Sequence, residues 1–216
     1  AVTLRASVLD AWVLPVTSPA AALRRAWGES PVRLVGHSLG GLAALEWALT
    51  FPEQVCELVL LDPTTPRFAP LRTAHVHAWC APIAQVGGGL ATLAAPLAPS
   101  IRRCGYRLTT GRIDPLPREL VRHYYRSPRV IHTLLAQWAT SRAQARRVGA
   151  LLQAGDNLAP GLPLLHLVAT GGQRAFAREQ RTLAALLGAE LQELSGLSHL
   201  FPLTHPHLVA ERIRLR

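Results

Sequence analysis

The apolar pattern in the first third of the chain changes from strand-like to helix-like spacing and back. Apolar runs at 31–36 and 58–61 flank a stretch, 39–49, in which small and large apolar residues recur at helical intervals. Asp62 and Pro63 close the second run. A run that is apolar on both faces is typical of a strand buried in a parallel sheet. The pattern predicts a strand, a tight turn, a helix and a second strand.

The same rhythm returns in the last quarter of the chain. Residues 162–170 and 189–194 have the apolar character of strands, and 174–188 and 206–215 have the spacing of helices, the first of which ends at Gly188. Strands and helices that alternate in this way are typical of a parallel sheet with helices packed on it.

The segment between these parts has a different character. It is rich in proline, glycine and arginine, and its longest regular stretches, 116–125 and 127–155, have helical spacing without strand alternation. Ser127 and Pro128 favour a helix start, because a serine caps the first turn and proline fits within it. We expect residues 64–160 to be a helical insertion.

Together the segments predict an α/β fold with a mostly parallel, open sheet flanked by helices. We expect residues 1–63 and 161–216 to form the core, and residues 64–160 to form a lid or cap inserted after the strand that ends at residue 61. The first 28 residues accommodate one strand, 9–16, and one short helix, 17–28.

Charge and hydropathy narrow the classes of partner. All 23 basic residues are arginine and the net charge is +10, but the arginines are scattered as singles and three pairs, without a basic run or an aromatic platform. We therefore expect no nucleic-acid partner. No apolar segment reaches the ~18 residues of a membrane span, and no signal peptide begins the chain. These observations predict a cytoplasmic location.

Cysteine and histidine provide no recognisable metal site. The three cysteines, Cys56, Cys80 and Cys104, are an odd number, which excludes a complete disulfide framework. His75, His77 and Cys80 have ligand chemistry, but no second cluster completes a tetrahedral set. We expect neither a metal nor another cofactor.

The turn after the first apolar run carries the clearest chemical motif. Gly36-His37-Ser38-Leu39-Gly40 matches Gly-x-Ser-x-Gly, and the predicted strand before it and helix after it are the context that a nucleophile elbow requires. The serine backbone in such a turn is strained, and we expect side chains at Gly36 and Gly40 to collide as strand and helix converge. The alternative is a glycine-rich turn with a capping serine.

A nucleophilic serine needs a histidine that accepts its proton. His199 follows the predicted strand at 189–194, and a predicted helix begins about seven residues later. His205 and His207 are alternatives, but their place at the helix entry favours a turn and cap.

These segments resemble those of the α/β-hydrolase fold superfamily. The sequence VGHSLGGLAALEWAL is similar to its nucleophile elbow, LVLLDP to its next strand, and GLSHLFPLTHPHLVAERI to its histidine loop and last helix. The resemblance covers Pro31 to Thr64 and Gly161 to Ile213, and it implies a third catalytic residue and an oxyanion hole.

The resemblance implies an acid in one of two places. The loop at 169–176, which commonly carries it, contains no Asp or Glu. Other members place the acid after the strand that follows the nucleophile helix, where this chain has Asp62. The alternative for Asp62 is a turn residue before proline. The remaining candidates fall within a predicted helix or strand and are poorly placed: Glu179, Glu190 and Glu193.

The sequence accounts for one of the two N–H donors of an oxyanion hole. The resemblance implies that the backbone N–H of Leu39 is one donor, and that the other comes from an earlier loop that often begins His-Gly. No histidine precedes His37. We expect the chain to be either the back two-thirds of a larger hydrolase or a shortened form.

The leading interpretation is a serine hydrolase that cleaves an ester or related acyl substrate through an acyl-enzyme. Thioester cleavage, peptidase action and acyl transfer remain open, whereas Ser38 argues against the Asp-dependent dehalogenases and epoxide hydrolases. Four aromatic residues of the predicted lid favour a small apolar substrate, unless they only fill its core: Trp79, Tyr124, Tyr125 and Trp138. The alternative class is a truncated or impaired hydrolase fold that binds a ligand or partner without turnover.

Overall fold

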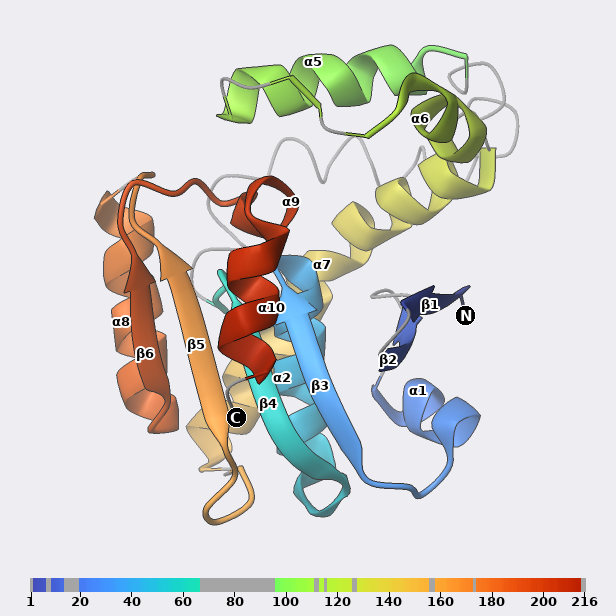
Figure 1. The fold of residues 1–216 in the computed structure, drawn as a ribbon. Coiled ribbons are helices and arrows are strands. Elements are labelled where there is room, and N and C mark those ends of the chain that lie inside the picture. Colours follow the sequence, from blue (N-terminus) through green and yellow to red (C-terminus); the bar gives the residue numbers. More distant parts are fainter. Residues whose placement is uncertain are drawn as a thin grey trace.

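The fold is built on a parallel sheet of four strands in the order β3-β4-β5-β6 (Figure 1). The computed structural model describes residues 2–6, 9–13, 20–66, 96–110, 113–114, 116–125, 128–155, 158–172 and 174–214. The four strands of the sheet are β3 (Val32–His37), β4 (Val55–Leu61), β5 (Leu164–Ala169) and β6 (Glu190–Leu194). This arrangement confirms the predicted α/β fold with an open parallel sheet.

Both faces of the sheet are covered, which explains the unbroken apolar runs of its central strands. Leu58 and Leu60 of β4 pack into a core that also contains residues of three helices: α2 (Leu39–Thr50), α7 (Pro128–Ala154) and α8 (Arg174–Leu187). The alternate residues Val59 and Leu61 pack into a second core. That core includes residues of α9 (Phe201–Thr204) and α10 (Pro206–Arg214).

Strand β4 begins three residues before its predicted start, in a segment of mixed polarity. Arg33 of β3 lies opposite Glu57 of β4 in the register, and Arg33 Nη2 donates to Glu57 Oε1 at 2.9 Å. A cross-strand pair of opposite charges stabilises neighbouring strands. The ion pair therefore extends the strand beyond the part that hydrophobicity alone predicts.

The first residues form two strands, where the sequence predicts one. β1 (Val2–Ala6) pairs antiparallel with β2 (Leu9–Val13), and the two make a separate two-stranded sheet. Along the chain, helix α1 (Ala20–Trp27) precedes β3, and the short helix η1 (Pro52–Gln54) precedes β4. Among the described strands β3 pairs with β4 only, so β3 lies at an edge.

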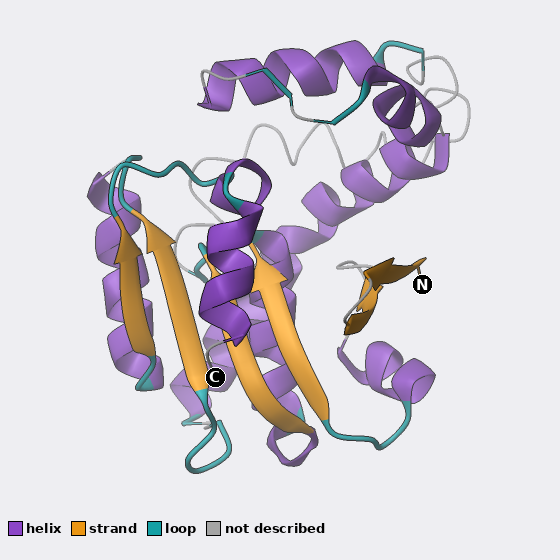
Figure 2. Cartoon of the chain, in the orientation of Figure 1, coloured by secondary structure: helices purple, strands orange, loops and turns teal. Residues whose placement is uncertain are grey.

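The described residues between β4 and β5 include three helices. Helices α5 (Ala98–Thr110) and α6 (Arg118–Tyr125) lie beyond the carboxyl ends of the strands (Figures 1 and 2). Helix α7 runs from α6 down to α2 (Figure 1). The range 67–95, with His75, His77, Trp79 and Cys80, falls outside the described residues, as does Ser127, although α7 does begin at Pro128.

A buried polar contact anchors α7 on α2. Glu46 of α2 is 5% exposed, and its two carboxylate oxygens accept from Gln144 Nε2 at 2.8 Å and from Arg147 Nε at 2.6 Å. Burial of a carboxylate is costly unless it is hydrogen-bonded and paired, and both conditions are met here. The contact fixes the position of α7 along α2.

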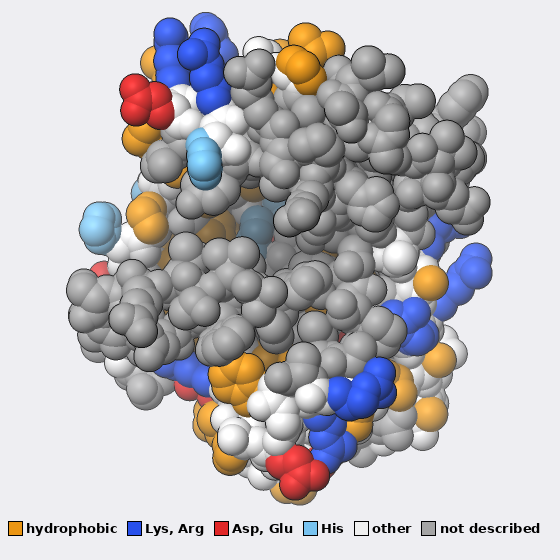
Figure 3. Space-filling view, turned by 90° about the vertical axis from the view of Figure 1, so that its right-hand side faces the viewer, with side chains coloured by type: hydrophobic (Ala, Val, Ile, Leu, Met, Phe, Trp, Pro, Cys, Tyr) orange, Lys and Arg blue, Asp and Glu red, His pale blue; other side chains and the backbone are white. Residues whose placement is uncertain are grey.

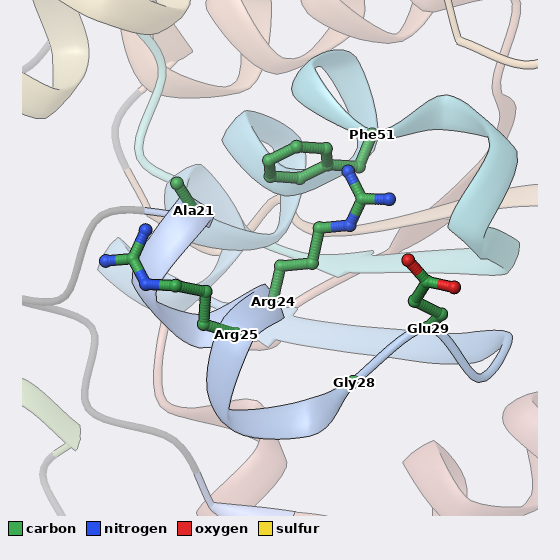
Figure 4. A pocket seen from close by; sticks show the side chains of 6 residues that line it. All are labelled: Ala21, Arg24, Arg25, Gly28, Glu29 and Phe51. Carbon is green, nitrogen blue, oxygen red and sulfur yellow. The ribbon is translucent and has the colours of Figure 1, made fainter.

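A cavity of about 350 Å³ lies beside α1, at the amino end of β3 (Figure 4). The guanidinium of Arg24 lies 4.4 Å above the ring of Phe51 and 3.4 Å from the carboxylate of Glu53. Arg25 and Glu29 complete its charged lining. The Arg24 guanidinium is therefore already in contact with an aromatic ring and an acid.

The described arginines do not gather into one patch on the face seen in Figure 3. They stand in separate groups at the top, at the right-hand edge and in the lower part of the view, with acidic side chains beside some of them. None of the described helices is long and apolar enough to cross a lipid bilayer.

Candidate active site

Ser38 occupies a strained turn between β3 and α2. Its φ is 55°, in the left-handed region that residues with a side chain rarely adopt. Backbone hydrogen bonds hold it there: its N–H donates to the Leu61 carbonyl at 3.2 Å, and its own carbonyl accepts from the N–H groups of Gly41 at 3.0 Å and Thr64 at 2.9 Å. The turn is therefore tied to the end of β4, and it has the strained strand-to-helix form of a nucleophile elbow.

The glycines of the turn have different roles from those that the motif predicts. A Cβ on Gly36 would lie 2.5 Å from the Gly40 carbonyl oxygen, so the predicted collision is correct there. At Gly40 the prediction is wrong, since a Cβ would meet nothing within 4 Å among the described residues. The second close approach is at Gly41, where a Cβ would lie 2.6 Å from Pro63 Cβ. The first turn of α2 directs Gly41, and not Gly40, toward β4.

The structure brings the three predicted side chains into one hydrogen-bonded row. His199 lies in the loop between β6 and α9, and its Nε2 is 3.0 Å from Ser38 Oγ. Its Nδ1 is 3.3 Å from Asp62 Oδ2. Because a carboxylate can only accept, Nδ1 carries the proton, and Nε2 is left to accept from the serine hydroxyl. The row joins residues 137 and 161 positions apart in sequence.

Asp62 is held in place by the neighbouring strand. It is 1% exposed and has a φ of 43°, so it is buried and its backbone is strained. Its N–H donates to the Leu167 carbonyl and its Oδ1 accepts from the Ala169 N–H, both at 2.9 Å. These bonds direct the other oxygen, Oδ2, toward His199.

The loop that commonly carries the acid has little space for one at Gly171. A Cβ there would lie 2.6 Å from the Leu197 carbonyl oxygen, and the Gly171 N–H already donates to that oxygen at 2.9 Å. The contact packs this loop against the segment that leads to His199. A side chain at Gly171 would displace the histidine loop.

The alternative site residues lie outside the row formed by Ser38, His199 and Asp62. Thr204 Oγ1 lies 2.8 Å from His205 Nδ1, which supports the predicted turn and cap, and His207 is exposed on α10. Glu193 pairs with Arg181, with 3.0 Å between Oε2 and Nη2. Two acids remain apart from the row, Glu190 at the start of β6 and Glu179 in α8.

His37 is a functional candidate that the sequence analysis missed. It is the variable residue before the serine, so the motif assigns it no role. Its Nε2–H donates to the His199 carbonyl at 2.8 Å, and the centroids of the two rings are 4.8 Å apart. Burial lowers the pKa of His37, and the nearby His199 lowers it further, which favours the neutral ring. His37 thus links the elbow to the histidine loop.

The N–H of Leu39 is available for an oxyanion. Leu39 is the first residue of α2, where backbone N–H groups have no partner within the helix, and none of the described residues supplies an acceptor for it. Such N–H groups at a helix N-terminus favour negative charge. This geometry is consistent with the predicted role of Leu39 as one donor.

Residues 3–212 match the family model described as "Alpha/beta hydrolase family". Because the match covers nearly the whole chain, the protein belongs to the α/β hydrolase family. The matched range includes the elbow and the row formed by Ser38, His199 and Asp62.

The individual relatives match this chain over different lengths. A stretch of 57 residues is 47% identical to lipase LipV of Mycobacterium tuberculosis, and it spans 24% of this chain but only 22% of the lipase. A solved structure of a Pseudomonas aeruginosa protein described as an epoxide hydrolase superposes with a TM-score of 0.67 at 20% identity, over 91% of this chain and 71% of that one. A thermophilic esterase from Thermogutta terrifontis gives a TM-score of 0.60 at 20% identity, over 94% and 72% of the two chains. At this identity the superpositions establish the fold.

Replacement by alanine should change the free energy of unfolding differently at the two glycines that flank Ser38. Gly36→Ala should lower the free energy of unfolding by about 1–3 kcal/mol, because its methyl group overlaps backbone atoms. Gly40→Ala, within α2, should leave stability unchanged or raise it by up to about 1 kcal/mol. Urea denaturation of both variants measures the difference, and equal effects would contradict the assigned packing.

The lowered pKa of His37 predicts that acid destabilises the protein. The unfolded chain binds a proton at His37 near pH 6.5, whereas the folded protein does so only at lower pH. The contribution of His37 to stability is therefore fully present above pH 6.5 and is lost as the pH falls through the folded pKa. In urea titrations at a series of pH values, His37→Gln should flatten this fall, and replacement of the exposed His207 by Gln should not.

Proposed function

We propose that this protein is a serine hydrolase that cleaves an ester or a related acyl compound through an acyl-enzyme. The observation that carries the proposal is the row from Asp62 through His199 to Ser38, with distances of 3.3 and 3.0 Å. A serine, an imidazole and a buried carboxylate in this order are the groups that acyl transfer requires.

Each group has a defined step in the proposed reaction. Ser38 Oγ attacks the acyl carbon while His199 Nε2 accepts the hydroxyl proton, and the tetrahedral oxyanion lies against the Leu39 N–H. His199 then gives the proton to the departing alcohol oxygen as the bond to the acyl carbon breaks. Water, deprotonated by the same imidazole, then attacks the acyl carbon, and the imidazolium returns this proton to Ser38 Oγ as the bond from Oγ to the acyl carbon breaks, which releases the acid. Asp62 keeps the proton on Nδ1 and stabilises the imidazolium.

The helical segment at 64–160 would act as a lid over this site. Ser38, Asp62 and the loop of His199 all lie at the carboxyl ends of strands, and helices α5 and α6 lie beyond that edge of the sheet (Figure 1). In open α/β sheets a ligand binds at the carboxyl ends of the strands. A small and mostly apolar substrate would bind at this edge of the sheet. The side chains of the aromatic residues predicted for the lid lie outside the described residues.

The serine at position 38 favours ester chemistry over epoxide opening. LipV is named a lipase and the Thermogutta terrifontis protein an esterase, whereas the Pseudomonas aeruginosa protein is described as an epoxide hydrolase. Epoxide opening in this fold uses a carboxylate nucleophile, and position 38 holds a hydroxyl. The acyl-enzyme route therefore suits this chain better.

A fluorophosphonate probe tests the nucleophile directly. The probe should label the folded protein at Ser38, because His199 activates this hydroxyl, and mass spectrometry of the digested protein locates the adduct. Ser38→Ala should abolish labelling, and replacement of the exposed Ser195 by Ala should leave it unchanged. A folded protein that takes up no probe would instead favour a binding module without turnover.

Asp62→Asn tests the acid. The amide can occupy the same space but cannot hold the His199 proton, so turnover of a chromogenic ester should fall by about 10³–10⁴-fold with little loss of stability. Glu46→Gln is the matched control, because it neutralises another buried carboxylate on the same core without contact to Ser38 or His199. Near-normal turnover by Asp62→Asn would show that another group supplies the acid.

A further inference from the structure

Two fully buried polar side chains lie next to the proposed acid but take no part in the proposed reaction. His166 lies in the middle of β5 and Gln180 lies in α8, and both are 0% exposed. His166 Nε2 is 2.8 Å from Gln180 Oε1, and Gln180 Nε2 donates to the Pro63 carbonyl at 2.7 Å. Pro63 directly follows Asp62.

The Pro63 carbonyl determines which atom donates and which accepts in both of these hydrogen bonds. The Pro63 carbonyl can only accept, so the amide NH₂ of Gln180 must face it, and the amide oxygen must face His166. His166 therefore donates from Nε2. Burial lowers the pKa of His166, which is consistent with a neutral ring that carries its single proton on this nitrogen.

We propose that Gln180, oriented by His166, is a positioning residue that sets the direction in which the Asp62 carboxylate points. This inference rests on the proposed function, because it concerns the acid of that reaction. The turn at Asp62 has a strained backbone with a φ of 43°, and such a conformation persists only where surrounding contacts determine it. β5 holds Asp62 itself through Leu167 and Ala169, and Gln180 holds the next carbonyl from the side of α8.

The polar character of the pair argues for a positioning role over simple packing. His166 Nδ1 is buried, and no described residue bonds to it. A buried polar atom without a partner is unfavourable, and two apolar side chains of the same shape would avoid that loss. What an apolar pair could not supply is the N–H that reaches the Pro63 carbonyl. The pair therefore provides a directed bond at the acid turn.

The opposite end of β4 provides a matched control. Gln54, just before this strand, is 3% exposed and has a similar arrangement of bonds. Its Oε1 accepts from Trp47 Nε1 at 3.0 Å, and its Nε2 donates to the Gly28 carbonyl at 2.6 Å and to the Ser30 carbonyl at 3.3 Å. Both glutamines thus connect a ring N–H to a backbone carbonyl, but only Gln180 does so beside Asp62.

The experiment compares Gln180→Met with Gln54→Met in the full chain, with p-nitrophenyl butyrate as substrate. Both variants should lose thermal stability, because Gln180 loses two side-chain hydrogen bonds and Gln54 loses three. Gln180→Met should lower kcat by about 10-fold to 100-fold with KM within about twofold, since the acid is misdirected in the transition state. Gln54→Met should keep kcat within about twofold of the wild type.

Gln180→Glu and Gln54→Glu repeat the comparison if a methionine variant does not fold. Glutamate keeps the shape and the acceptor for the ring N–H, but it places an oxygen against the backbone carbonyl in place of the donor. Equal changes in kcat at positions 180 and 54 would overturn the inference, because both glutamines would then be structural only.

A crystal structure of Gln180→Met separates this inference from the proposed function. If the wild type neither cleaves the ester nor takes up the fluorophosphonate, the proposed function fails, and the positioning inference is decided by geometry alone. A separation between Asp62 Oδ2 and His199 Nδ1 that grows beyond hydrogen-bond range would support it. A separation that stays at 3.3 Å would overturn it.

Discussion

A carboxylate that is 1% exposed at the end of a strand has to find hydrogen-bond donors, and the position of Asp62 is set by those it finds. One oxygen is bound by the Ala169 N–H of the neighbouring strand, and the other lies against the ring of His199. Because the first bond crosses from β4 to β5, the sheet itself determines how the carboxylate is turned. The histidine loop, and through it the serine, is arranged around this group.

Backbone constraints bring the ends of two adjacent strands close together at the site. Ser38 and Asp62 follow β3 and β4, and these are the two described residues other than glycine that have a positive φ. Gly41 allows α2 to pack directly on Pro63, and the Thr64 N–H donates to the Ser38 carbonyl. The two strained turns therefore support each other, and neither can relax without displacing its neighbour.

The core and the residues of the candidate site could be predicted from local patterns, whereas the residues that hold the site in place could not. β4 and β5 are apolar on both faces because both faces are buried, so their position along the chain was evident. The motif around Ser38 and the loop of His199 were recognisable because their residues lie close together in the sequence. The structure places those side chains in contact, although their catalytic roles remain predictions. The pairing of β1 with β2 was missed because each strand has only five residues, too few for a pattern in either to be distinctive.

Polar residues within apolar segments have no local signature. His166 lies within a fully buried strand, and its partner Gln180 is 14 residues away in a helix, so only packing brings them together. His37 was overlooked because its contact is with a backbone carbonyl 162 residues away. At Gly40 the motif predicted a steric constraint, but the rotation of α2 places the crowding one residue later.

Helix α7 contains 27 residues, which at 1.5 Å per residue is a rod about 40 Å long. Gln144 and Arg147, in its second half, attach it to Glu46 on the helix that follows Ser38, and its first residues lie beside α6. The bonds to Glu46 therefore connect the helices beyond the strand ends, through α7, with the helix that begins directly after Ser38.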